Sequence, residues 1–372
     1  MRQIPFWTQR WLQLPVRRFA LQAPSPMPPV SPPDGPRAIT DADFPQTGSQ
    51  DAQLTAMLNW AVLAPSVMNT QPWRFRVVGS APDSARAELY VDRARQLVRV
   101  DPDAREAVIS CGAALFTLRI AAQHYGFATV VTYAGPEDDP DLIATLRLAG
   151  PSRASAAEEA LFRAIKARHT NRDPYADLDL PAGLIAAIQE AAAQEGAHLH
   201  ILTGDAEKGT LADLIAEAIR SQGEDEATVN ELRAWLRPVG DRRSDGVPDD
   251  VQGGWDRLSY LHTDARSLAA AARRLALAAP ALLVLTTERD TRHDWVRSGQ
   301  ALQRVLLLAA SHGLAASYFN QPTEIPALRQ QVSTLAGRDH VQLVFRLGTP
   351  IEADGTPRRD VSAVLKPDDY VA

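Results

Sequence analysis

The chain has 372 residues, a mass of 40.5 kDa and a formal net charge of −6 at pH 7. Its composition, 45% hydrophobic and 23% charged, is that of an ordinary globular protein of about two domains. The acidic balance excludes the strong positive field of a general nucleic-acid binder, and the single cysteine, Cys111, excludes an intramolecular disulfide. The longest apolar run, residues 275–287, is too short to span a bilayer. We therefore expect a cytoplasmic protein with no membrane span and no nucleic-acid partner.

The first 20 residues form a basic and aromatic segment that contains four arginines and no acid. The segment lacks the apolar core and the cleavage site of a secretory signal. Two interpretations remain: an interfacial or partner-docking arm, and a leader or subunit-packing tail, which we favour. Seven prolines between residues 24 and 36 predict an extended linker, so the folded body should begin near residue 39.

Beyond the linker, the hydrophobic pattern predicts a mixture of helices and strands. Asp101 followed by Pro102 predicts a helix N-terminus, and Gly126 predicts the end of the same helix. The mixture predicts an α+β fold. The predicted helices cover residues 50–63, 101–126, 154–167, 181–194, 206–222, 226–236 and 293–313, and the predicted strands cover residues 73–78, 87–92, 127–133, 198–203, 281–286 and 341–347.

An internal repeat suggests that the chain consists of two similar halves. Residues 112–126 align without a gap on residues 299–313, and both segments begin and end with glycine. We expect an N-terminal arm and linker over 1–38, a first module over 39–150 and a second module over 151–372. The second module contains a stretch without a counterpart, residues 205–254. This insertion is interpreted equally well as a lid over a ligand or as an arm that embraces a partner subunit.

The first segment with candidate chemistry lies between the helix and the strand predicted at residues 50–63 and 73–78. It contains Pro65, Ser66, Asn69 and Gln71. Amide and hydroxyl groups offer both donors and acceptors, so they suit a flat heterocycle. From spacing alone, a loop whose polar side chains cap their own backbone is the favoured interpretation.

A second segment follows the helix predicted at residues 154–167. Arg168 and Arg172 flank Thr170, and two guanidiniums with a hydroxyl between them suit a phosphate monoester. The alternative is a basic helix C-terminus that interacts with its own dipole. Gly348, Arg358 and Arg359 add a further basic cluster after the last predicted strand.

These segments together resemble the nitroreductase superfamily of FMN-dependent oxidoreductases. Residues 64–75 resemble its flavin loop, and residues 168–172 resemble its Arg-x-Ser-x-Arg phosphate motif, with Thr170 in the serine position. Residues 299–321 resemble its long central helix and flavin-facing loop, and Arg358 with Arg359 resembles its C-terminal basic pair. The arrangement is most similar to the Acg-type branch, in which two modules are fused. This resemblance implies a nitroreductase-like α+β fold with the two modules forming a pseudo-dimer.

The resemblance also implies where FMN binds. In the ordinary family one module carries both motifs and FMN sits at a dimer interface, whereas here the ring loop lies in the first half and the phosphate motif in the second. One composite FMN site per chain is therefore expected, with the mirror-related site inactive. The implied phosphate contacts are Arg168, Thr170 and Arg172, with Arg358 or Arg359. The implied contacts at the ribityl chain and ring edge are Ser66, Asn69 and Gln71, and a backbone N–H near Asn320 and Gln321 is implied at flavin N5. Pro65, His169, Asn171 and Gly348 are implied beside these contacts.

The implied function is electron transfer from NAD(P)H through FMN to a nitroaromatic, a quinone or a similar planar small molecule, without a catalytic side chain. No unambiguous lysine serves the N1 edge of the flavin, for which Arg74 is the candidate. An FMN-binding or storage protein with little turnover is therefore the alternative, and a flavin-free partner scaffold is a third interpretation. His198 and His200 lack a third ligand nearby, so no metal is expected. Pairing of the chain as a homodimer is left open.

Overall fold

The computed structural model describes residues 35–79, 85–135, 137–238, 240–248, 263–337, 340–351 and 355–366. The predicted N-terminal arm and most of the linker lie outside the described residues, as do residues 249–254 of the predicted insertion. Short 3₁₀ turns at Pro36–Ala38, Asp41–Asp43, Val67–Asn69 and Arg93–Arg95 connect the longer elements in the first half.

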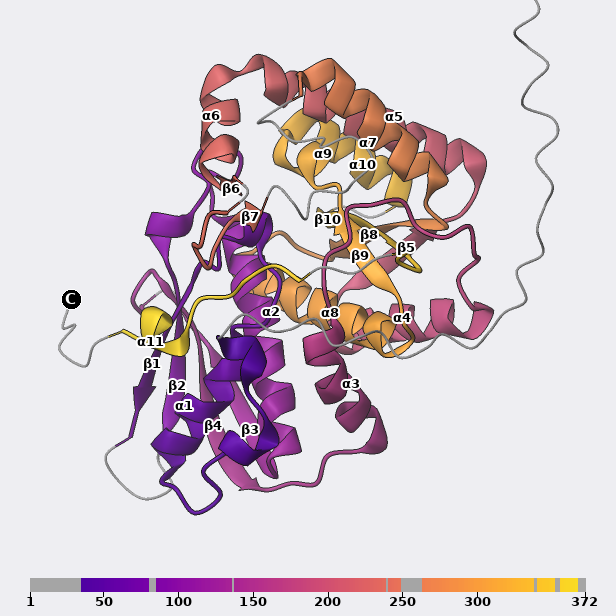
Figure 1. Ribbon diagram of the computed structural model, residues 1–372. Helices are drawn as coiled ribbons and strands as arrows, with labels where there is room; N and C mark the ends of the chain where they lie inside the picture. Colours follow the sequence, from indigo (N-terminus) through magenta and orange to yellow (C-terminus); the bar gives the residue numbers. More distant parts are fainter. Residues whose placement is uncertain are drawn as a thin grey trace, which may run out of the picture. The chain divides into compact units, whose positions relative to one another are not determined.

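The first half forms an antiparallel sheet with the strand order β1-β2-β4-β3 (Figure 1). One face of the sheet buries an apolar layer against helices α1 and α2, which includes Trp73, Phe75 and Leu89. The elements are α1 (Gln50–Ala61), β1 (Trp73–Val78), β2 (Arg86–Val91), α2 (Arg105–His124), β3 (Phe127–Tyr133) and β4 (Leu142–Pro151).

The second half forms another antiparallel sheet, with the order β5-β8-β10-β9. Strands β5, β8, β9 and β10 and helix α8 correspond in order to β1, β2, β3 and β4 and helix α2, so the two sheets share one topology. This finding confirms the expected α+β fold and fits two fused modules. The elements are α3 (Ala156–Ala167), α4 (Ala182–Gln194), β5 (His198–Leu202), β8 (Ala281–Thr287), α8 (Arg292–Ser311), β9 (Ala315–Tyr318) and β10 (His340–Gly348).

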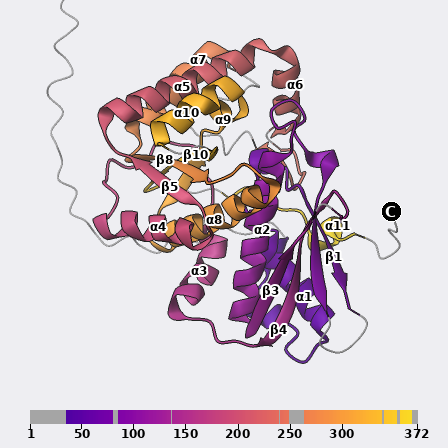
Figure 2. The ribbon, with the colours of Figure 1, turned by 180° about the vertical axis from the view of Figure 1, so that it is seen from behind.

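Helices α2 and α8 pack against each other between the two sheets (Figures 1 and 2). At the crossing, a Cβ atom on Gly112 would lie 2.2 Å from the Val296 carbonyl oxygen, and one on Gly299 would lie 1.9 Å from the Ile109 carbonyl oxygen. The first glycines of the two repeats therefore meet at the point where the halves are joined. Helix α2 has the length and hydropathy of a membrane span, but most of its side chains are buried in this interface and core.

The segment between β5 and β8 forms a helical layer over the second sheet; it contains the predicted insertion and the helix that follows it, and is called the insertion from here on. Helices α5 and α7 pack together, and residues such as Leu211 and Ile215 share a core with Val284 and Val344 of the sheet. The insertion therefore contributes to the folded core. Its elements are α5 (Asp205–Glu224), α6 (Glu226–Ala234), a short parallel pair of strands, β6 (Leu236–Arg237) and β7 (Val247–Pro248), and α7 (Ala265–Ala278); α9 (Gln321–Glu324) and α10 (Pro326–Ala336) follow later between β9 and β10.

The C-terminal segment returns from the second half to the first. Helix α11 (Val361–Val364) lies beside β1, and Leu365 forms a parallel bridge with Phe75 (Figure 1). The backbone N–H of Lys366 donates to the Phe75 carbonyl oxygen at 2.7 Å. This return brings the basic pair Arg358 and Arg359 to the loop before β1.

The predicted start of α2 at Asp101 is wrong by a few residues. The helix begins at Arg105, after Ala104 in a left-handed conformation with a φ of 59°. The Asp101 carboxylate still accepts hydrogen bonds from the backbone N–H groups of Glu106 and Ala107, at 3.1 and 3.0 Å. Asp101 therefore accepts hydrogen bonds from the free N–H groups of the first turn, but it does so from outside the helix and is not its N-cap residue.

Candidate functional site

The loop between α1 and β1 is held in an unusual conformation. Met68, Asn69 and Gln71 have positive φ angles of 44°, 52° and 52°. Non-glycine residues pay a steric cost there, so other contacts must hold the loop. The Gln71 backbone N–H donates to the Ser66 hydroxyl at 2.9 Å, and the Val67 N–H donates to the Ser110 hydroxyl of α2 at 3.3 Å.

The side chains of Asn69 and Gln71 bind protein groups instead of facing a cavity. Asn69 Nδ2 donates to the Gly246 carbonyl oxygen at 2.8 Å, and Gln71 Nε2 donates to the Ser244 carbonyl oxygen at 2.8 Å. Gln71 Oε1 accepts from the Arg359 N–H at 2.8 Å. Both carboxamides are therefore held by protein groups, and their assignment to ribityl and ring contacts stays a prediction.

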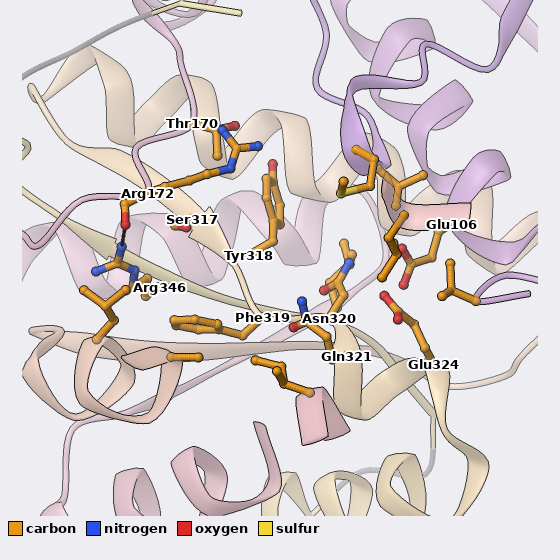
Figure 3. Close-up of a pocket in the computed structure, with 18 of the residues that line it drawn as sticks. Glu106, Thr170, Arg172, Ser317, Tyr318, Phe319, Asn320, Gln321, Glu324 and Arg346 are labelled. Atoms are coloured by element: carbon orange, nitrogen blue, oxygen red, sulfur yellow. Dashed lines mark hydrogen bonds between the residues drawn. The ribbon is translucent and has the colours of Figure 1, made fainter. Parts of the chain in front are cut away.

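The segment after α3 is fixed to the edge of the second sheet. Thr170 forms a parallel bridge with Ala316 of β9, and the Asn171 N–H donates to the Ala316 carbonyl oxygen at 2.9 Å. Figure 3 shows the Arg172 guanidinium beside the hydroxyl groups of Thr170 and Tyr318. The structure thus places the arginine, threonine and tyrosine side chains around one point.

Four buried guanidiniums gather near this point. Arg37, Arg168, Arg172 and Arg358 each have a buried nitrogen without a hydrogen-bond partner. Within the described ranges, none of the four forms a salt bridge with an acid. Arg358 is partly held in place, because its Nη1 donates to Asn69 Oδ1 at 3.0 Å and to the Thr356 hydroxyl at 2.6 Å.

The electrostatics of this group are those of an anion site. Burial lowers the pKa of Arg172 to about 10, and burial with the nearby Arg168 lowers the pKa of Arg37 to about 10. Burial, and then the guanidiniums of Arg37 and Arg168, hold the pKa of Arg358 well below its usual value. Burial raises the pKa of Tyr318 to about 12. An anion bound among these groups would relieve their mutual repulsion and their desolvation.

A cavity of about 480 Å³ adjoins the arginine group and is lined by both halves of the chain (Figure 3). Pro65, Ser66, Val67 and Met68 contribute one wall. The second half contributes Thr170 and Arg172, the run from Ser317 to Gln321, and Arg346. The insertion adds an apolar wall that includes Ile219, Leu232, Leu268 and Leu275. The motifs on either side of the cavity are about a hundred residues apart in the sequence.

Several predicted contacts lie near this cavity without lining it. His169 Nδ1 lies 2.9 Å from the Ala167 carbonyl oxygen, and Asn171 Oδ1 accepts from the Asp173 N–H at 3.1 Å. Gly348 allows the Tyr175 ring to approach, since a Cβ would lie 2.4 Å from that ring. The Arg359 guanidinium binds the carbonyl oxygens of Gln71 and Ala363. The assignment of these four residues to the cofactor stays a prediction. Arg358 lines a smaller cavity of about 120 Å³ with Arg37 and Ser244.

Sequence reasoning missed several residues of the site. Arg346 interrupts the apolar strand β10, and its Nη2 donates to the carbonyl oxygens of Arg172 and Asp173, both at 2.9 Å. A charged residue inside a buried strand was a signal that could have identified it. Glu106 and Glu324 also line the cavity, but their spacing in the sequence gives no sign of it. Arg37 follows a proline-rich stretch without any motif around it.

Comparisons with known proteins are consistent with one family. The sequence profile of the nitroreductase family matches residues 165–349. The Mycobacterium tuberculosis protein "Putative NAD(P)H nitroreductase Rv3131" is 33% identical over 349 residues, which cover 89% of this chain and 95% of that protein. The protein "Putative NAD(P)H nitroreductase acg" from the same organism is 27% identical over 341 residues. The match covers 87% of this chain and 98% of that protein. The crystal structure of FMN-dependent nitroreductase NfnB from Mycobacterium smegmatis with NADPH is 16% identical, with a TM-score of 0.37 over 56% of this chain and 98% of that one.

Proposed function

The chain belongs to the nitroreductase family, and from this premise we propose that it is an FMN-dependent oxidoreductase. It would pass electrons from NAD(P)H to a nitroaromatic, a quinone or a similar planar acceptor. The cofactor would lie in the cavity between the two halves, with its phosphate among the arginines and its ring toward Ser66 and Asn320.

The arginine group is the observation that supports this proposal most directly. Arg37, Arg168, Arg172 and Arg358 are buried together, and no described acid pairs with them. Burying unpaired charge costs several kcal/mol per ion, so a site of this kind is complementary to a dianion. A phosphate monoester offers the charge and the acceptor oxygens that guanidiniums and the Thr170 hydroxyl recognise. The donor set therefore fits the phosphate of FMN.

The cavity beyond the arginines fits the flat part of the cofactor and a second ligand. The run from Pro65 to Met68 lies on one side and the run from Phe319 to Gln321 on the other, while the insertion closes an apolar side. A bound flavin would supply the hydride chemistry. The residues of this chain would bind and orient the ring and keep water from it.

An absorption spectrum of the purified protein, recorded anaerobically before and after NADPH, tests the proposal. We expect the two bands of oxidised flavin, and we expect NADPH to bleach them. Bands that persist until dithionite is added would contradict reduction by NADPH. The absence of bands after incubation with added FMN would contradict cofactor binding altogether.

A second candidate function is FMN binding or storage with little turnover. Arg74, the residue considered for the N1 edge of the flavin, pairs with Asp92 at 3.0 Å and does not line the cavity. In that position Arg74 would not supply a positive charge to the N1 edge of the flavin, and this favours slow reduction of the flavin. Steady-state NADPH oxidation with menadione separates the two functions, because a storage protein would turn over no faster than free FMN.

A further inference from the structure

Two carboxyl groups meet at the end of the cavity away from Arg172. Figure 3 shows the carboxyl groups of Glu106 and Glu324 directed toward each other, with Asn320 and Gln321 beside them. Glu106 lies in the first turn of α2 and Glu324 at the end of α9, so the two come from different halves of the chain. Neither residue has a role in binding the phosphate.

The hydrogen bonds around the pair are incomplete. Glu106 is 2% exposed, and its Oε1 accepts from Arg105 Nη2 at 3.3 Å. Its Oε2 has no partner at hydrogen-bond geometry, and the Asn320 side chain is the polar group that acts on this carboxyl from the cavity side. Glu324 Oε2 accepts from Gln222 Nε2 of α5. Gln222 is 7% exposed and lines the cavity, and its Oε1 also lacks a partner. Buried polar atoms usually have hydrogen-bond partners, so these atoms at the cavity wall indicate that a polar group of a ligand forms the remaining hydrogen bonds.

The charges that face the pair do not compensate two carboxylates. Asp101 is a third acid nearby, and its oxygens accept from the α2 N-terminus. Arg329 on α10 is paired with Asp290 at 2.8 Å. Arg105 pairs directly with Glu106 at 3.3 Å, and the charge of Arg329 also acts on Glu106. Arg274 of α7 is a further charged residue that lines the cavity.

Such a pair holds a proton near neutral pH. Burial raises the pKa of Glu106 to about 7, and burial with the charge of Glu106 raises the pKa of Glu324 well above its usual value. Two like charges at short range in a desolvated site cannot both ionise readily, so the carboxyls titrate as a unit. The Glu106 pKa and the facing geometry both place a transferable proton at the cavity wall.

We propose that Glu106 and Glu324 form a proton-sharing pair that donates a proton to the bound electron acceptor. The inference rests on the proposed function. Reduction of a quinone to a hydroquinone adds one hydride, supplied by NAD(P)H through the flavin, and one proton, supplied by the pair. The pair is left with both carboxyls ionised beside Arg105, and a proton from water restores it before the next turnover.

The test compares Glu106→Gln and Glu324→Gln with Glu217→Gln, a control at an exposed position on α5. The wild type and the three variants are loaded with FMN, and menadione reduction is measured across the pH range around neutrality. We expect equal FMN content and at least about a tenfold loss of kcat near pH 7 in the two pair variants, because a general acid typically contributes about a hundredfold or more and each variant keeps one carboxyl. In the wild type, activity should fall as the pH rises through the apparent pKa of the pair. Removing one carboxyl lowers the pKa of the other, so this fall should move to lower pH in both variants.

A second measurement does not depend on turnover. The infrared spectrum of the wild type should contain a protonated carboxyl band that shifts in D₂O, disappears as the pH is raised and is absent from the E106Q/E324Q double variant. A band that persists in the double variant would overturn the pair as the proton carrier. The proposal would also be overturned if E106Q and E324Q had the same rates and pH profiles as E217Q. If E106Q fails to fold, E324Q alone decides. Failure of the wild type to bind FMN or to oxidise NADPH is a different result, which overturns the proposed function itself.

Discussion

Asn69 connects three segments of the chain through a single carboxamide. Its Nδ2 reaches the carbonyl oxygens of Gly246 and Pro357, and its Oδ1 accepts from Arg358. Asparagine also tolerates the left-handed conformation that the loop requires, as few side chains do. The Asn69 side chain therefore supports both the left-handed loop and the position of Arg358.

Replacement of Asn69 by alanine should therefore destabilise the protein and loosen the arginine group. Three hydrogen bonds are lost and a less tolerant residue occupies a φ of 52°, so we expect a loss of about 2 kcal/mol or more in the free energy of unfolding. Asn59→Ala is the matched control, because Asn59 makes one hydrogen bond within its own helix. Urea denaturation of both variants measures the difference. Equal stability of the two would contradict the role of Asn69.

Replacement of both Arg168 and Arg172 by alanine should abolish retention of FMN. The two residues supply buried guanidiniums that no described acid compensates, so the apoprotein should remain folded while the dianion loses its main partners. Arg153→Ala with Arg163→Ala is the matched control, because both side chains are exposed beside the same segment. Flavin content after gel filtration measures retention. An unchanged flavin content in the first double variant would refute the phosphate site.

Helices α2 and α8 depend on glycine where they cross. A side chain at either glycine would meet the carbonyl oxygen of the opposite helix at less than 2.5 Å. Close packing of two helix backbones explains why the repeat preserves these positions within otherwise different sequences. The glycines that end the repeats, Gly126 and Gly313, instead have positive φ angles of 89° and 76°, as helix ends require.

Gly112→Ala or Gly299→Ala should each destabilise the protein by about 3 kcal/mol or more, because overpacking here displaces helix backbone. Gly209→Ala in α5 is the control, since nothing lies within 4 Å of the added Cβ. At that uncrowded helix position, alanine should raise the stability by up to about 1 kcal/mol. Thermal unfolding followed by circular dichroism compares the three variants. A loss of stability well below this value in the Gly112 and Gly299 variants would show that α2 and α8 can move apart at little cost in free energy.

The elements that the sequence predicts well are those with a strong local pattern. β1 and β3 match their predicted ranges, and α8 agrees within two residues. β4, α7 and α10 were missed. β4 ends in Gly150 and Pro151, which are poor strand formers, so tertiary packing decides its structure. The amphipathic pattern of the alanine-rich α7 was a local signal that could have identified it.

The same limit applies to the candidate site. Ser66, Thr170 and Arg172 belong to compact motifs, and all three line one cavity. The partners of the Asn69 and Gln71 carboxamides could not be predicted, because the segments that hold them lie more than 170 residues away. No spacing rule relates Glu106 to Glu324, since only the fold places these residues together.

At the scale of the molecule, the two halves share their cores. Val296 and Leu307 of α8 are buried in the cluster of the first sheet, and Ile109 of α2 is buried in the cluster of the second. The C-terminal segment also adds Val361 and Val364 to the first cluster. Neither half therefore encloses a complete core of its own.

Calorimetry of the whole chain should accordingly show one cooperative unfolding transition. A fragment that ends at residue 150 should remain unfolded when it is expressed alone, because its core lacks the side chains of α8 and α11. Joint expression with the fragment that begins at residue 151 should restore folding. Two separate transitions, or a cooperatively folded first fragment, would show that the halves are independent.

The two walls of the cavity come from segments that are far apart in the sequence but covalently connected. The run from Pro65 to Met68 and the pair Thr170 and Arg172 belong to a single polypeptide, joined by helix α2, the first sheet and α3. When such walls belong to separate subunits, dilution takes the site apart. Here the connecting chain keeps their effective concentration constant. A single molecule, however dilute, would therefore carry everything it needs to hold its ligand.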